Sequence, residues 1–156
     1  MSDDTAEPLA DEPVGLPFVD EHGTRIAAPR ELVWTALRRY VDSSLVEPSG
    51  DSSRDDSSHL LGRLLGTEPR SGFAVAREVP NRHLGLAGRH RFARYLLVFE
   101  VADTDGGQTL LTARTYAAFP GPRGRIYRAL VIGSRGHVVA VKRMLRSVRR
   151  LTTTAT

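Results

Sequence analysis

The chain has 156 residues, 40% of them hydrophobic, which suits one domain with a core of its own. It has no cysteine, which excludes a disulfide framework, a thiolate metal site and a thiol nucleophile. No apolar run approaches the roughly 20 residues that cross a bilayer. Residues 1–16 carry acids and no base, unlike a signal peptide, so the sequence predicts a cytoplasmic protein.

The net charge of +4 hides a strong asymmetry along the chain. All 18 acidic residues lie at or before Asp105, whereas residues 106–156 carry ten arginines and lysines and no acid. A basic end of this kind can attract anionic lipid, nucleic acid or an acidic ligand, although a solvated helix face is the commoner explanation. Aromatic residues do not interleave with these bases. Specific nucleic-acid binding is therefore disfavoured, and a weak contact with an anionic surface stays open.

The first elements in chain order are an arm, a strand and a helix. Residues 1–16 are acidic and lack periodicity, which predicts a disordered arm. Residues 17–28 are predicted to form a first strand. Pro29 favours the start of a helix and Glu31 its first turn, so we predict a helix over residues 29–42. Its apolar stripe consists of Val33, Trp34, Leu37, Tyr40 and Val41.

The middle of the chain alternates between turn residues and short apolar runs. Residues 42–56 are rich in Ser, Asp, Pro and Gly, which predicts a loop. Residues 59–65 are predicted to form a second short helix that ends at Gly66. Alternation of apolar and polar residues then predicts four antiparallel strands joined by tight turns. These strands cover residues 73–79, 83–92, 94–103 and 108–119.

The last element is predicted to be one long amphipathic helix over residues 123–151. Apolar residues recur at helical spacing on one side, and basic residues occupy the other. Gly133 and Gly136 lie inside this pattern, where they would kink the helix or let a strand or ligand approach closely. Strands with segregated helices indicate a single α+β domain over residues 17–152, followed by a tail at 153–156.

The segment from Ile26 to Trp34, IAAPRELVW, and the closing hairpin with its long helix resemble the helix-grip fold of the START, polyketide cyclase and birch-pollen-allergen superfamily. The resemblance covers residues 17–151. It implies a curved antiparallel sheet wrapped around a long C-terminal helix, with two short helices after the first strand and a hydrophobic cavity between sheet and helix. Members bind lipids, sterols, polyketides or hormones, and some catalyse cyclisation or dehydration.

The superfamily has no universal catalytic motif, so no catalytic residue can be carried over onto this chain. Residues 88–92 and 119–125 are not general marks of the superfamily, which indicates a distinct subgroup.

Two residues that can carry charge fall on faces predicted to point inward. His90 shares a strand face with Leu86 and could bind a polar group of a ligand or act as an acid or base. It could equally be a structural histidine hydrogen-bonded to a neighbour. Arg77 interrupts the apolar face that Phe73 and Val75 share. It must therefore meet a carboxylate, such as one on a ligand, or reach solvent at the strand end.

Other polar side chains are expected near the same space. His137 lies beside the apolar stripe of the last helix. Tyr95, Thr115 and Tyr127 could contribute hydroxyl groups, although residues of these types more often belong simply to the core or the surface.

The leading hypothesis is a protein that holds a small hydrophobic or amphipathic ligand, such as a lipid or a polyketide, without transforming it. The predicted ligand-binding residues are Phe73, Val75, Arg77, Leu86, His90, Tyr95, Leu97, Phe99, Thr115, Tyr127 and His137. An enzyme of the cyclase or dehydratase type that uses His90 as acid or base is one alternative. Docking of the basic helix on nucleic acid or an anionic surface is another.

No other chemistry is indicated. The five histidines show no metal-ligand spacing, and neither a nucleophile elbow nor a phosphate-binding loop is present, so no metal and no cofactor is expected. If Leu97 and Phe99 point inward, Leu96 and Val98 give the sheet an apolar outer face, which leaves a homodimer open.

Overall fold

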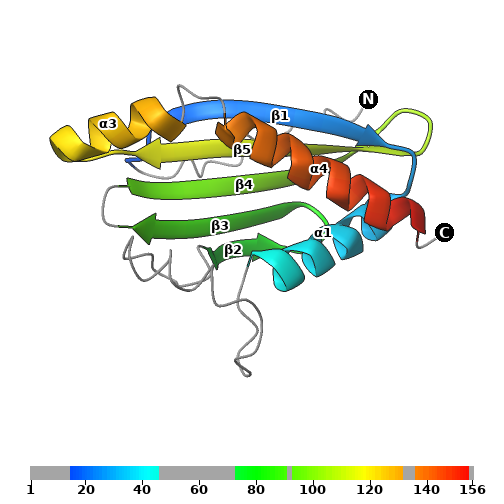
Figure 1. Cartoon of the computed structure of the whole chain (residues 1–156). Helices are drawn as coiled ribbons and strands as arrows, with labels where there is room; N and C mark the ends of the chain where they lie inside the picture. The colour runs from blue at the N-terminus through cyan, green and yellow to red at the C-terminus, as the bar shows by residue number, and fades with distance from the viewer. Residues whose placement is uncertain (1–14, 46–72, 91–92, 132–135, 155–156) are drawn as a thin grey trace, which may run out of the picture.

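A computed structural model describes residues 15–45, 73–90, 93–131 and 136–154. These residues form one antiparallel sheet with two helices on one face and a third helix at one end (Figure 1). Most of the predicted acidic arm and the predicted short helix at 59–65 lie outside the described residues. None of the described helices is both long and apolar enough to cross a bilayer.

Five strands form the sheet in the order β1-β5-β4-β3-β2, and every neighbouring pair is antiparallel. In chain order they are β1 (Phe18–Ile26), β2 (Ala74–Val79), β3 (His83–His90), β4 (Ala93–Thr104) and β5 (Gln108–Ala118). The pairing of β1 with β5 joins the first strand to the last. Residues that are far apart in the sequence therefore lie side by side at this edge of the sheet.

Local backbone geometry explains two of the turns. The hairpin between β4 and β5 passes through Gly106 and Gly107, whose φ angles of 79° and 72° lie in the left-handed region that glycine adopts without strain. Thr104 Oγ1 closes this turn by donating a hydrogen bond to the carbonyl oxygen of Gln108, at 3.0 Å. Asn81, with φ 61°, occupies the turn between β2 and β3, and asparagine tolerates this conformation better than most residues.

Two helices, α1 (Arg30–Ser44) and α4 (Gly136–Thr154), cover the same face of the sheet and pack against each other (Figure 1). Their apolar stripes and the inward residues of the strands form the hydrophobic core. Its fully buried side chains include Val33, Leu37, Val41, Leu84, Leu86, Phe99, Leu111 and Val148. Thr109 Oγ1 donates a hydrogen bond of 2.7 Å to the carbonyl oxygen of Ala28, which fixes the chain where β1 leads into α1.

The prediction of one helix over residues 123–151 needs correction. The structure describes two helices there, α3 (Gly121–Val131) and α4, which begins at Gly136. Only α4 lies across the sheet with α1, whereas α3 lies near the end of β5 (Figure 1). Glycine disfavours a continuous helix by about 1 kcal/mol relative to alanine, which agrees with a second helix that starts at Gly136.

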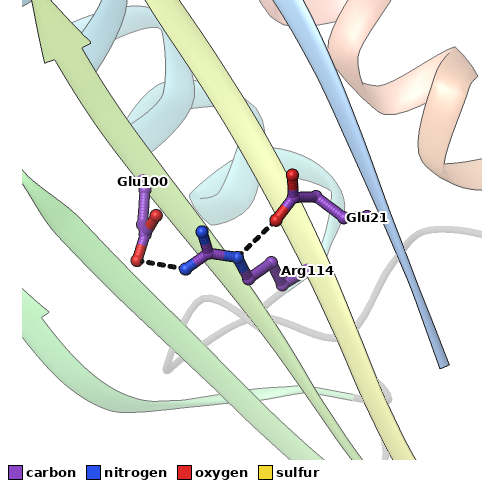
Figure 2. Close-up of polar contacts among 3 residues, drawn as sticks. All are labelled: Glu21, Glu100 and Arg114. Atoms are coloured by element: carbon purple, nitrogen blue, oxygen red, sulfur yellow. Dashed lines mark hydrogen bonds and ion pairs between the residues drawn. The ribbon is translucent and has the colours of Figure 1, made fainter. Parts of the chain in front are cut away.

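The other face of the sheet carries a network of charged side chains that spans three strands. Arg114 on β5 donates hydrogen bonds from Nη1 to Glu100 Oε1 on β4, at 2.8 Å, and from Nε to Glu21 Oε2 on β1, at 2.5 Å (Figure 2). The bond to Glu21 raises the pKa of Arg114 above its ordinary value. Each of these three charged side chains therefore has an oppositely charged partner on the exposed face of the sheet.

Candidate functional site

A cluster of polar side chains lies between β1 and the start of α4. Asp20 Oδ2 is 2.9 Å from Nε2 of His137 on α4 and 3.2 Å from Nε2 of His22, two residues further along β1. Thr115 on β5 is the residue that pairs with Asp20 across the sheet. The side chains of Asp20, His22 and His137 are only 17%, 21% and 16% exposed, so this cluster is mostly shielded from solvent.

Two oxygen atoms of this cluster have unused hydrogen-bonding capacity. Asp20 Oδ1 and Thr115 Oγ1 are buried and have no hydrogen-bond partner among the described residues. Leaving a buried polar atom without a partner costs about 1–3 kcal/mol, so a water molecule or another polar group is favoured at this position. In the described part of the chain, no group of three or more His, Cys, Asp or Glu side chains could hold a metal ion.

A groove of about 390 Å³ opens next to this cluster. The ends of β1 and β5, the residues that follow β5, and α3 form its walls. Its lining consists of Pro17, Phe18, Val19, Ala117, Ala118, Phe119, Pro120, Arg125 and Arg128. Val19 immediately precedes Asp20, and Ala117 lies two residues beyond Thr115 on β5, so the groove and the polar cluster are neighbours. A volume of this size is at the small end of the range for ligand pockets, about 300–1,000 Å³.

A β-bulge shapes the wall that β1 contributes. The register between β1 and β5 shifts between Phe18 and Asp20, so Phe18 pairs with Tyr116. The rings of Phe18 and Tyr116 meet edge to face with centroids 5.7 Å apart. The shift leaves Val19 as the extra residue of the bulge, where a strand bends and can re-aim its side chains.

Several residues predicted to line a ligand cavity lie elsewhere in the fold. Leu86, Leu97 and Phe99 are buried in the hydrophobic core and do not line the groove. Phe73 packs against the core and meets Tyr95 edge to face, with ring centroids 5.1 Å apart. Val75, on β2 at the far edge of the sheet, pairs with Leu86 of β3 and is 39% exposed.

Arg77 lies on the opposite face from the one predicted for it. A register shift between Val75 and Arg77 places Arg77 opposite Gly85, whereas Leu84 and Leu86 on either side of that glycine point into the core. The shift inverts the alternation of β2, so Arg77 lies on the face of the charged network, away from the helices.

The remaining predicted site residues divide into two groups. Thr115 and His137 are brought together with Asp20 in the polar cluster. The backbones of His90 and Tyr127 lie in β3 and α3, and their side chains are outside what the structure describes.

Asp20 and His22 were missed because polar residues at alternate positions of an edge strand look like a solvent-facing side. The available signal was that His22 and Asp20 lie four and six residues before the buried Ile26, and residues an even number apart on a strand share a face.

His83, on the charged face of the sheet, gives a pH-dependent prediction. Burial lowers the pKa of His83 below its ordinary value of 6.5; the Glu100 charge opposes this, and Arg77 and Arg114 reinforce it. The unfolded chain therefore binds a proton more readily than the folded chain, so protonation reduces stability as the pH falls below about 6.5. We expect His83→Gln to lose less stability than the parent between pH 7 and pH 5 in urea denaturation. Equal losses would contradict this assignment.

The fold resembles solved structures at low sequence identity. A conserved protein from Geobacillus kaustophilus matches with a TM-score of 0.53 and 16% identity, over 86% of this chain and 95% of that chain. A protein from Thermus thermophilus matches with a TM-score of 0.52 and 16% identity, over 90% and 99%. A START superfamily protein from Mycobacterium smegmatis matches with a TM-score of 0.52 and 12% identity, over 89% and 99%. The chain therefore shares the fold of this START superfamily protein.

This START-like fold confirms the α+β helix-grip architecture that the segment from Ile26 to Trp34 and the closing helix predicted. At these identities the likeness concerns the fold alone. No protein-family model and no curated protein sequence matches the chain.

Proposed function

We propose that this START-like protein binds a small amphipathic ligand with a negatively charged head, such as a fatty acid or a polyketide-like carboxylate, in the groove between β1, β5 and α3. The observation that carries this proposal is the composition of the lining: two arginines stand beside an otherwise apolar wall. Pockets for small ligands commonly combine apolar walls with a few placed polar groups. The ligand-binding activities of the superfamily that the sequence resembles agree with this assignment.

The two arginines are placed to meet one anionic group. Arg125 and Arg128 are three residues apart on α3, so their side chains emerge from neighbouring positions on one side of the helix. Arginine binds carboxylates through paired N–H donors, which favours a carboxylate over a neutral head. The apolar part of the ligand would then contact Val19, Ala117 and Phe119.

Holding a ligand is better supported than transforming it. The described lining of the groove contains no histidine and no carboxylate, the groups that most often act as acid or base. Asp20 and its two histidines adjoin the groove but do not line it. In this proposal their role is to fix the start of α4 against β1 next to the binding site.

Displacement of an anionic fluorescent probe by decanoate tests the proposal. We expect saturable binding, and we expect the double variant Arg125→Gln/Arg128→Gln to bind decanoate about three- to tenfold more weakly. This range corresponds to about 0.3–0.7 kcal/mol for each exposed charge. Arg149→Gln, an exposed arginine near the end of α4, is the matched control and should bind like the parent.

A neutral ligand of the same length separates the roles of the head and the tail. Decanol should bind the parent and the double variant equally, because it lacks the charge that the arginines recognise. The proposal fails if decanoate does not bind saturably, or if Arg149→Gln weakens binding as much as the double variant.

A further inference from the structure

The helix α3 makes few contacts with the rest of the described fold. Apart from Gly124, the α3 residues whose exposure is described are exposed, and α3 makes no extensive contact with another described helix or strand. It has only 11 residues, and isolated helices shorter than about 12–15 residues are marginal in water. A second surface that covers α3 would therefore stabilise it.

The exposed surface of α3 combines basic and apolar side chains. Arg123, Arg125 and Arg128 are all exposed on this one short helix, which contains no acid. Ile126 is 64% exposed between them. Phe18, at the start of β1, is 58% exposed and lines the same groove as Arg125 and Arg128. Two large apolar side chains thus stand out at the end of the molecule where the arginines gather.

This combination fits the surface of an anionic bilayer. Interfacial helices insert apolar side chains into the boundary between headgroups and acyl chains, while arginines and lysines contact anionic lipids. A polyanion such as nucleic acid would pair with the arginines but would gain little from Ile126. The absence of any acidic residue after Asp105 removes the repulsion that an anionic surface would otherwise meet along the C-terminal third of the chain.

We propose that α3 is an interfacial helix that docks this protein on bilayers of anionic phospholipid. Ile126 and Phe18 enter the boundary region, and Arg123 and Arg125, which flank Ile126 around the helix, contact the phosphate headgroups. Docking does not depend on the groove being a ligand site. If the proposed ligand binding also holds, α3 places the mouth of the groove near the bilayer surface, because Arg125 both lines the groove and flanks Ile126.

Sedimentation of the full chain with vesicles tests this docking. We expect binding to vesicles of phosphatidylcholine and phosphatidylglycerol in a 3:1 ratio, weak or no binding to pure phosphatidylcholine, and a steep loss of binding as salt rises from 50 to 300 mM. Ile126→Ser should weaken binding about tenfold, since it removes most of an inserted apolar side chain. Arg123→Gln should weaken it about fivefold, the change expected for one basic residue at an anionic surface.

Matched variants elsewhere on the surface control for general effects. Leu32→Ser replaces an exposed apolar residue of α1, and Arg149→Gln replaces an exposed arginine of α4; both should bind vesicles like the parent. Unchanged urea midpoints would show that Ile126→Ser and Arg123→Gln still fold. Equal binding to both kinds of vesicle, binding that salt does not weaken, or binding to duplex DNA without binding to vesicles would each overturn the proposal. Loss of decanoate binding alone would leave the vesicle result standing.

Discussion

Replacing Phe99 by alanine is expected to lower the free energy of unfolding by about 3–5 kcal/mol. Phe99 is fully buried near the middle of β4, and its partners on the neighbouring strands, Leu84 and Ala113, are fully buried as well. The loss combines the transfer of a large apolar side chain with the cavity that its removal leaves, because neighbours in a packed core relax only in part.

Urea denaturation followed by the fluorescence of Trp34, the sole tryptophan, measures this effect. Phe18→Ala is the matched control, because Phe18 is 58% exposed at the edge of the sheet and should cost less than about 1 kcal/mol. The comparison also separates two pictures of this region. A loss below about 1 kcal/mol for Phe99→Ala would indicate that its ring borders open space, as predicted from the sequence, and does not belong to a packed core.

Replacing Asp20 by alanine is expected to lower the free energy of unfolding by about 1–3 kcal/mol. The change removes the carboxylate that lies within 3.2 Å of both His22 and His137, and leaves two mostly buried imidazoles without it. Because His137 belongs to α4 and Asp20 to β1, the loss also removes a polar link between the last helix and the first strand.

Two further substitutions show whether this loss is specific to the cluster. Asp20→Asn retains one acceptor oxygen and should lose less stability than Asp20→Ala. Asp42→Ala removes a carboxylate that is 56% exposed and that, within the described residues, forms an ion pair with Arg38 one turn earlier on the same helix. It should cost less than about 0.5 kcal/mol. If Asp42→Ala destabilises the protein as much as Asp20→Ala, the cluster is not the link between α4 and β1.

Much of the fold could be predicted from the sequence because its signals are local. Alternation located four of the five strands, the glycines after Asp105 located one hairpin, and the stripe around Trp34 located α1. Prediction failed where a regular pattern is interrupted. The bulge before Arg77 inverts a strand face without any change in the alternating pattern. At the C-terminal end, α3 and α4 are separate helices where the apolar periodicity alone predicts one continuous helix.

The candidate site was harder to predict because its parts come from distant segments. The groove takes residues from β1, from the end of β5 and from α3, and none of these segments signals a pocket by itself. The pairing of β1 with β5 brings two of them together, and a single sequence does not specify that pairing. The polar cluster likewise needs α4 to carry His137 to Asp20, which no periodicity reveals.

The short strand β2 has a consequence for how the protein behaves at high concentration. It lies at one edge of the sheet, has six residues, and is interrupted by the shift between Val75 and Arg77. The N–H and C=O groups of β2 are irregularly spaced and lie next to the charges of Arg77 and Glu78. A strand of another chain therefore cannot form a regular series of hydrogen bonds with this edge. This edge therefore discourages fibril growth and domain exchange between copies of the protein.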